Sequence, residues 1–376
     1  MSIQDRSVRD TDIWQADIGH SPSTGPSGEI KELASGVDAL YLSGRAVLGP
    51  AFLERLVAGR LEAELWEAPV AVVVGGETFD LLPRGSGKYR FCLVHPYGQL
   101  SVTPSEQLPS FRIQPRAEFL HGVGPADCVE WFRGVLEREC GPVVLTVSRI
   151  DLHADWQGWE LSGDDRHRFL CRADARATYE DGGILTGFEF GRRSSKTVCA
   201  RIYDKTAESA KNGSDYWADV WGADYDNESH VVRVEFEINR VGLRQYGLDT
   251  PEEVLAATGA LWADLTSTWL SYRRRTEDET KSRWPIALEW EQIRRARLVD
   301  GTFGIRRMYE GRRRGDLRML APGLVGYLSS FAVLTGAKDW ASTAGSLAWF
   351  VRSYCREGER SFEDRIAVKQ RETLLP

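Results

Sequence analysis

The chain has 376 residues, of which 42% are apolar and 27% are charged, and its formal net charge is −7. This apolar content, with 13 tryptophans, excludes a largely disordered chain, and the negative charge excludes a protein coated in positive charge but not one with a local basic groove. Six scattered cysteines without a Cys-x-x-Cys pair predict neither a zinc cluster nor a disulfide framework, so we expect a reduced, cytoplasmic protein.

In chain order, the first segment is a polar arm. Residues 1–35 are rich in Ser, Gly, Pro and Asp, which predicts a flexible arm, and their charges predict no secretory signal. Near the other end, residues 321–337 form the longest apolar run, which is too short and too rich in Gly and Ser to span a bilayer. We therefore expect no membrane association.

The chain then contains two segments that begin and end alike. Strands around Asp38 and Asp151 begin the two segments, and each strand is followed by a helix-like stretch. The helix-like stretches are residues 50–65 and 162–178, and the closing strands are residues 111–120 and 231–240, in which Arg116 and Glu118 match Arg233 and Glu235. Between the segments, residues 125–140 have apolar side chains at helical spacing, which predicts a helix that ends at Gly141.

These elements predict an α+β fold made of two related halves with antiparallel sheets. An internal duplication explains the matches, but short matches of this kind also arise by chance. The predicted core spans residues 36–250, with halves of about 36–140 and 141–250. A mainly helical region, residues 251–376, is expected after the core, and its last two apolar helices are expected to form a small bundle or a homodimer contact.

In the second half, three predicted strands each carry polar side chains on one face. These are Asp151, His153 and Asp155 on the first strand, Arg201, Tyr203 and Lys205 on the second, and Arg233, Glu235 and Glu237 on the third. If the strands are neighbours in one sheet, this polar face brings together four carboxylates, one imidazole, three cations and one phenol.

Two interpretations of this polar face stay open. An exposed sheet face is normally polar, with opposite charges paired across strands for about 0.2–1 kcal/mol, and tyrosine favours strands. Alternatively, four neighbouring carboxylates are costly unless a cation lies among them, and carboxylates with one imidazole suit Mg²⁺ or Mn²⁺. A metal beside a tyrosine and an arginine suits phosphoryl transfer, in which a phenolate attacks phosphorus.

The ordered motifs resemble one known family. "RIDLHAD" (149–155), "FGRRSSKTVCARIYDKTAE" (190–208) and "VVRVEFEINR" (231–240) occur in the order found in the replication initiation factor family. This family comprises rolling-circle replication initiators of small plasmids and related relaxases of integrative conjugative elements. The resemblance covers about residues 36–300 and rests on the order and spacing of the three motifs.

The resemblance implies a metal-dependent DNA nickase that joins itself to a 5′ end through a tyrosine. By position, Tyr203 is the expected nucleophile, and Arg201 and Lys205 are expected near the scissile phosphate, where the two cations favour the phenolate. The expected metal ligands are Asp151, Asp155 and Glu235, with His153 and Glu237 as further candidates. The expected phosphate contacts are Arg192, Arg193, Lys196 and Arg233.

A basic segment follows the predicted core. Residues 273–318 contain 14 Arg or Lys and 8 Asp or Glu, against the acidity of the rest of the chain. Its clusters, including Arg312, Arg313 and Arg314, suit DNA phosphates, but solvated helix faces with internal ion pairs are the alternative.

The function predicted from the sequence is therefore initiation of rolling-circle replication by nicking and religating origin DNA, either single-stranded or in a cruciform. The alternatives are a relaxase for conjugative transfer, a non-catalytic DNA-binding protein of the same fold, and a metal hydrolase without a covalent step. A host helicase is a further candidate partner.

Overall fold

The computed structural model describes residues 30–193, 197–213, 216–299, 317–357, 361–363 and 366. The chain divides into two compact units. The sheet unit comprises Met1–Leu243 with Leu248–Ile305, and the C-terminal unit comprises Arg244–Gly247 with Arg306–Pro376. Most of the predicted flexible arm, residues 1–29, lies outside the described residues, and the first strand begins at Lys31, before the expected boundary at residue 36.

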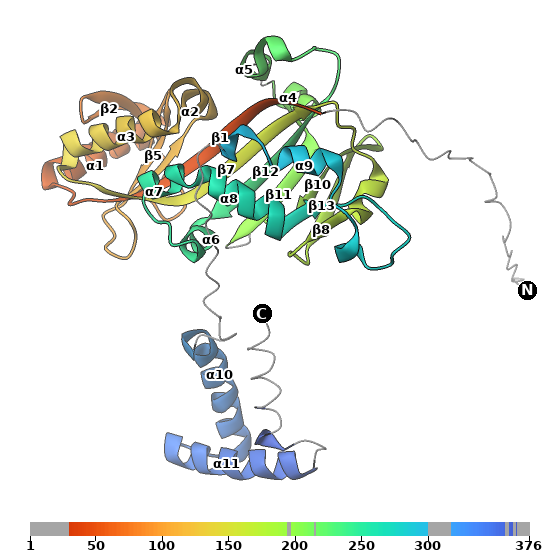
Figure 1. The fold of residues 1–376 in the computed structure, drawn as a ribbon. Helices are drawn as coiled ribbons and strands as arrows, with labels where there is room; N and C mark the ends of the chain where they lie inside the picture. Colours follow the sequence, from red (N-terminus) through yellow and green to blue (C-terminus); the bar gives the residue numbers. More distant parts are fainter. Residues whose placement is uncertain are drawn as a thin grey trace, which may run out of the picture. The chain divides into compact units, whose positions relative to one another are not determined.

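The sheet unit is built on an antiparallel sheet that has eleven strands in the described part of the chain, in the order β2-β3-β4-β5-β6-β1-β7-β12-β11-β10-β9 (Figure 1). Its strands are β1 (Lys31–Arg45), β2 (Val70–Val74), β3 (Glu77–Leu81), β4 (Phe91–His95), β5 (Gly98–Val102), β6 (Phe111–Pro115), β7 (Val144–Gln157), β9 (Arg176–Asp181), β10 (Ile184–Phe190), β11 (Val198–Asp204) and β12 (Val231–Asn239). Together with the helices described below, this sheet confirms the predicted α+β class.

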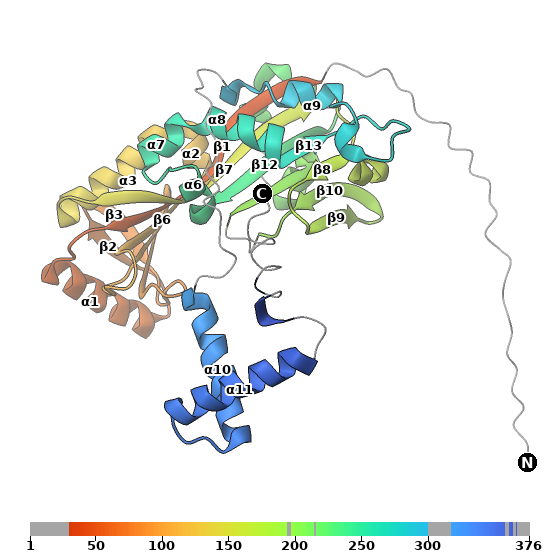
Figure 2. The ribbon, with the colours of Figure 1, turned by 60° about the horizontal axis from the view of Figure 1, so that its bottom comes forward.

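The strand order is the same on both sides of the sheet centre, where β1 pairs with β7. Outward from β1 lie β6, β5, β4, β3 and β2, and outward from β7 lie β12, β11, β10 and β9. In both halves the first strand is at the centre, and the remaining strands approach the centre in chain order. An internal duplication produces such an arrangement, and common ancestry of the halves stays a prediction. Figure 2 shows β9 and β10 at one end of the sheet.

The first half folds around helices α1 (Pro50–Trp66), α2 (Ala117–Val123) and α3 (Pro125–Cys140). Helix α1 approaches the sheet closely, because a Cβ atom on its Gly59 would lie only 2.9 Å from the Val72 side chain. Helix α3 matches the predicted helix and ends at Gly141, whose φ of +77° suits glycine. The closing strand was predicted too long: β6 stops at Pro115, and Arg116 and Glu118 belong to the start of α2.

Helices cover both faces of the second half of the sheet. They are α4 (Lys205–Asn212), α5 (Trp217–Trp221), α6 (Arg240–Gln245), α7 (Pro251–Ala256), α8 (Thr258–Asp264) and α9 (Leu288–Ile293). Figure 1 shows α7, α8 and α9 in front of β7, β12 and β11. Trp262 of α8 packs on Phe236 of β12 with ring centroids 5.4 Å apart, so this face holds the apolar core.

Two expectations about this half were wrong. Residues 162–178 contain only a short 3₁₀ helix, Gly163–His167, followed by β8 (Phe169–Cys171) and the start of β9. Strand β8 pairs with β13 (Leu270–Tyr272), about a hundred residues further along the chain, and such a partner cannot be seen in a local pattern. Residues 251–305 were grouped with the C-terminal helices, but they belong to the sheet unit, where Trp262 and Trp290 are fully buried.

The C-terminal unit contains the two predicted apolar helices, α10 (Leu317–Thr335) and α11 (Trp340–Glu357). Gly336, with φ +69°, follows α10, and Phe331 packs on Phe350 with ring centroids 5.5 Å apart. None of the helices within the described residues combines the length and the apolar character that crossing a bilayer requires.

Candidate active site

The polar side chains predicted on three strands, all except Lys205, share one face of the sheet, and this face is buried. Across β12, Arg201 lies opposite Glu235 on one side, and His153 lies opposite the same Glu235 on the other. Arg233 and Asp155 are 0% exposed and Glu235 is 1% exposed. This burial contradicts the interpretation of a solvated sheet face.

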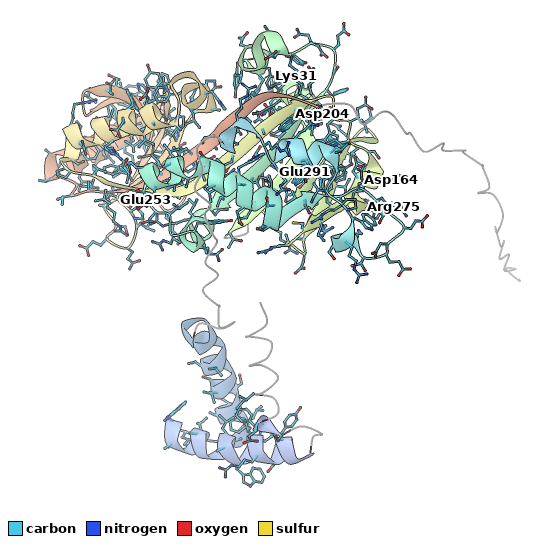
Figure 3. All side chains as sticks on the ribbon, viewed as in Figure 1. Lys31, Asp164, Asp204, Glu253, Arg275 and Glu291 are labelled. Atoms are coloured by element: carbon cyan, nitrogen blue, oxygen red, sulfur yellow. The ribbon has the colours of Figure 1, made fainter. Side chains whose placement is uncertain are left out.

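Three helices cover the buried polar face. Trp217 and Trp221 of α5 are buried, and His121 of α2 lies with its ring centroid 4.9 Å from that of Trp217. Lys205, which was expected on the strand, is instead the first residue of α4. Asp204, labelled in Figure 3, ends β11 and accepts a hydrogen bond from the Ala207 backbone N–H at 2.9 Å, which caps α4.

Arg233 lies at the centre of this buried network. Its Nε and Nη2 atoms donate to the two carboxylate oxygens of Asp155 at 2.6 and 2.8 Å, and its Nη1 donates to Asp38 at 2.7 Å. The guanidinium carbon lies 4.0 Å from the ring centroid of Trp217, and Trp221 Nε1 donates to Asp155 at 2.8 Å. Burial acts to raise the pKa of Asp155, but the Arg233 guanidinium outweighs it and holds that pKa below its usual value.

Asp38 reaches this network through an irregularity in β1. Val37 pairs with Leu152 and Ala39 pairs with Asp151, so Asp38 is the extra residue of a β-bulge. A bulge re-aims a side chain without ending the strand. It brings the Asp38 carboxylate to Arg233, 195 positions later in the chain.

A second arginine, Arg149, binds two further carboxylates of the face. Arg149 Nε donates to Asp151 at 2.7 Å, and Arg149 Nη2 lies 2.8 Å from Glu237. Asp151 and Glu237 are directly opposite each other on β7 and β12, where like charges repel. The guanidinium offsets part of this repulsion, but burial and the neighbouring Glu235 and Glu237 carboxylates still raise the pKa of Asp151 to about 7.

Tyr203 and Glu235 form the pair on which the chemistry of the site depends. The Tyr203 hydroxyl donates to Glu235 Oε2 at 2.9 Å, and Arg201 binds the other oxygen of the same carboxylate. The Arg201 guanidinium carbon also lies 5.2 Å from the centroid of the Tyr203 ring. A hydroxyl, a carboxylate that accepts its proton and a third group that orients the carboxylate make up the arrangement of an activated nucleophile.

The protonation state of Tyr203 differs from the sequence expectation. Burial raises the pKa of Tyr203 well above its usual value, and the Glu235 carboxylate acts in the same direction against Arg233 and Arg201. The expected phenolate is therefore not the resting state. The two cations that flank Tyr203 are also bound by carboxylates. Arg201 binds Glu235, and Lys205 Nζ lies 2.6 Å from Glu208.

Tyr203 borders a cavity of about 460 Å³. The cavity lies over β9, β10 and β11, beside α4, and Arg201 and Arg193 also line it. Gly187 of β10 is directly opposite Tyr203, and a Cβ atom there would lie 2.6 Å from the Tyr203 Cβ. Access from the cavity is what distinguishes Tyr203 from a tyrosine that is merely buried.

Comparison with known proteins finds a likeness among solved structures but no match among sequences. No family model and no curated protein sequence matches this chain. Its fold is similar to that of a rolling-circle replication initiator protein from Geobacillus stearothermophilus. The two chains are 16% identical, the TM-score is 0.42, and the match covers 71% of this chain and 96% of that chain.

The predicted metal ligands do not fit a metal ion as they are placed. Asp155 is bound by Arg233, Asp151 by Arg149, and Glu235 by Arg201. Within the described residues, no group of three or more His, Cys, Asp or Glu side chains is arranged to hold a metal ion. A cation in this predicted set would have to displace guanidinium groups that are already hydrogen-bonded to the carboxylates.

His153 differs from the other four residues predicted as ligands. It is buried, and neither ring nitrogen has a hydrogen-bond partner in the described part of the structure. Burial lowers its pKa to about 4, so the imidazole is neutral at pH 7. Its ring centroid lies 5.7 Å from that of His121, whose Nε2 lies 3.4 Å from Asp38 Oδ1.

The predicted DNA-binding residues divide into three groups. Arg192 and Arg193 are exposed, as a phosphate contact requires. Arg233 is fully buried and bound by two carboxylates, so its assignment as a DNA contact was wrong. The remaining predicted contacts, Lys196, Arg312, Arg313 and Arg314, lie outside the described residues.

Sequence reasoning missed several members of the site. Asp38 was noticed as an acid near the start of a strand, but not assigned to the site. Arg149 is the first residue of the "RIDLHAD" motif, and its spacing of two from Asp151 was a usable signal. Trp217 and Trp221 gave no such signal, because only the packing of α5 brings them to the sheet.

Proposed function

We propose that this chain nicks and rejoins single-stranded DNA through Tyr203. The observation that carries the proposal is the hydrogen bond from the Tyr203 hydroxyl to Glu235, whose other oxygen is bound by Arg201, at the wall of a cavity. A tyrosine with only a structural role would not require both a carboxylate held in place by an arginine and a cavity beside its hydroxyl.

The step follows from these groups. Glu235 accepts the phenolic proton while the Tyr203 oxygen forms a bond to phosphorus. The bond between phosphorus and the 3′ oxygen breaks, and its electron pair goes to that oxygen, which takes a proton from Glu235 or from water. The products are a 5′-phosphotyrosyl bond and a free 3′-hydroxyl. The reverse sequence rejoins the strand.

The arginines have separate tasks in this step. Arg201 holds Glu235 in place and lies beside the Tyr203 ring, so its positive charge is close to the position where the phosphorane develops negative charge. Arg193 is exposed and lines the same cavity, where it can bind a phosphate of the approaching strand. Arg233 and Asp155 are fully buried, so they stabilise the strands that carry Tyr203 and Glu235 and do not contact the substrate.

The biological role that best suits this chemistry is initiation of rolling-circle replication, because nicking leaves a 3′-hydroxyl that a polymerase extends. The three ordered strand motifs support this role. A relaxase uses the same step, so origin-dependent extension by a polymerase is the distinguishing test. Origin DNA, a host helicase and a second copy of this chain are the partners that this role implies.

The experiment that tests this reaction asks which fragment of the cleaved strand becomes covalently attached to the protein. A 5′-phosphotyrosyl bond keeps the fragment that carries the 3′ end. Single-stranded oligonucleotides tiled across the DNA that flanks the gene carry a label at either the 3′ or the 5′ end. We expect wild-type protein to acquire the 3′ label, resistant to denaturing electrophoresis, and not the 5′ label. Tyr203→Phe should acquire neither, while Tyr225→Phe, which changes a tyrosine packed on Trp221, should match wild type.

If Tyr203→Phe still formed the adduct, Tyr203 would not be the nucleophile, and Tyr216 would be the next candidate. Absence of any adduct in wild type over the full tiling would favour a non-catalytic DNA-binding protein. Circular dichroism of both variants separates loss of chemistry from loss of fold.

A further inference from the structure

The cavity beside Tyr203 has features that the strand-transfer step does not use. On the sheet, Gly187 of β10 pairs with Tyr179 of β9 on one side and with Tyr203 of β11 on the other. Two tyrosines thus flank a glycine across three neighbouring strands, roughly 10 Å apart at the backbone. Tyr179, Gly187 and Tyr203 all line the cavity of about 460 Å³, and the part of this cavity beside Tyr179 and Glu189 is called the slot below.

The polar groups at one wall of the slot are arranged to accept a hydrogen bond. The Tyr179 hydroxyl donates to Glu189 Oε2 at 2.9 Å, which fixes the carboxylate. A carboxylate has about four acceptor positions, so further donors can bind it. Tyr179 is 47% exposed, so an aromatic surface is available for stacking.

Three of the other charged groups around the cavity already have partners. Lys211 pairs with Asp181 at 2.8 Å, and Arg201 binds Glu235. Asp204 caps α4 by accepting from the Ala207 N–H. The wall at Glu189 therefore suits a flat, neutral group with an amino edge, while Arg193 of the same cavity is left for a phosphate of the strand.

We propose that this slot binds one nucleobase of single-stranded DNA, stacked on Tyr179, with the amino group of cytosine or adenine donating to Glu189. The inference rests on the proposed function for the position of this nucleotide: a strand whose phosphate reaches Tyr203 places an adjoining nucleotide at the cavity, because neighbouring nucleotides are about 3.4 Å apart along a stacked strand. Stacking on an aromatic side chain and hydrogen bonding to a carboxylate are the usual means of holding an unpaired base. The slot would make the nick depend on the base beside it.

The test measures binding without cleavage, so that it does not depend on the nicking reaction. Full-length Tyr203→Phe protein is titrated against fluorescently labelled oligo(dC), oligo(dA), oligo(dT) and an abasic strand of the same length, with polarisation as the readout. We expect oligo(dC) and oligo(dA) to bind more tightly than oligo(dT), and the abasic strand to bind most weakly.

Substitutions of Tyr179 and Glu189 then test whether the slot causes the preference for oligo(dC) and oligo(dA) over oligo(dT). Adding Tyr179→Ala should weaken oligo(dC) binding about tenfold, in line with the loss of one stacked base, and hardly change binding of the abasic strand. Tyr179→Phe keeps the ring and should stay within about threefold of the parent. Glu189→Gln offers an amide donor as well as an acceptor and should reduce the preference of oligo(dC) over oligo(dT) to within about twofold.

Two matched variants serve as controls. Ile184→Ala lies on the same hairpin at a side chain that is exposed and does not line the cavity, and Glu160→Gln changes an exposed carboxylate elsewhere in the unit. Both should leave the base preference unchanged. Equal weakening of oligo(dC) and the abasic strand by Tyr179→Ala would overturn the proposal, and so would equal binding of all four strands.

The outcomes distinguish a failure of the nucleobase proposal from a failure of the proposed nicking reaction. Base-dependent binding that needs Tyr179 and Glu189 supports the slot even if wild-type protein never forms an adduct, and in that case only the proposed function fails. An adduct without any base dependence in binding overturns the slot and leaves the proposed function in place.

Discussion

Tyr203 on β11 donates its phenolic hydrogen to Oε2 of Glu235 on β12 at 2.9 Å. Glu235 is almost completely buried, and Arg201 binds its other oxygen. The tyrosine is thus held protonated next to the group that can take its proton, and the two arrive there because neighbouring antiparallel strands bring them to one face. This pairing replaces the phenolate expected from the flanking cations.

The first prediction concerns Glu235 as the base. Glu235→Gln keeps the size and one acceptor oxygen of the side chain but cannot take a proton. Adduct formation should slow by a factor of about 10²–10⁴, the usual contribution of a general base, while affinity for single-stranded DNA changes little. Rapid-quench measurement of the labelled adduct gives the rate, and Glu228→Gln in an exposed loop is the control. A rate within threefold of wild type would remove Glu235 from this role.

The second prediction concerns the protonation of Tyr203. Because its pKa is raised well above its usual value by burial, the phenol should stay protonated through pH 10. Protein labelled with ¹³C at the tyrosine Cζ position reports each phenol separately by NMR. The signal that disappears in Tyr203→Phe should not shift between pH 7 and pH 10. A shift of this signal near pH 8 would restore the phenolate interpretation.

The third prediction concerns the buried pair of Asp155 and Arg233. Asp155→Asn leaves a fully buried guanidinium without its main partner, although Asp38 stays in place. Removing one partner of a buried ion pair usually costs about 3–5 kcal/mol of the free energy of unfolding, measured by urea denaturation. Asp181→Asn breaks an exposed ion pair with Lys211 and should have little effect. Equal midpoints for the two variants would contradict the structural role given to Arg233.

The fourth prediction concerns the glycine between the two tyrosines. Gly187→Ala puts a methyl group 2.6 Å from both the Tyr203 Cβ and the Ile202 carbonyl oxygen, so β11 must shift. We expect at least tenfold slower adduct formation and a loss of about 1–3 kcal/mol in unfolding free energy, as overpacking normally causes. Gly163→Ala, whose Cβ meets nothing within 4 Å, is the matched control. Unchanged kinetics in Gly187→Ala would show that Tyr203 tolerates displacement.

The fifth prediction concerns the divalent metal, which rests on the sequence resemblance. That resemblance predicts that EDTA stops adduct formation and that Mg²⁺ or Mn²⁺ restores it. The arginine pairing of Asp151, Asp155 and Glu235 argues against this predicted ligand set. Calorimetric titration of wild type and of His153→Gln with Mn²⁺ measures binding independently of nicking. Full activity in EDTA, together with no heat of binding, would contradict the predicted metal.

The sequence by itself determined the local features of this fold. Period-two alternation placed Asp151, His153 and Asp155 on one face of β7, and Arg233, Glu235 and Glu237 on one face of β12. Apolar residues at helical spacing predicted α3 with its end at Gly141. Such patterns are readable because backbone geometry imposes them on each segment separately.

Only the tertiary structure decided what the polar face does. Alternation cannot distinguish a polar face in water from one covered by α5, and it cannot show that Arg233 binds Asp155, 78 positions away. The bulge that brings Asp38 to the same arginine depends on the pairing of β1 with β7. Contacts between distant segments form only when the whole sheet selects its register, because each strand alone has many partners of similar free energy.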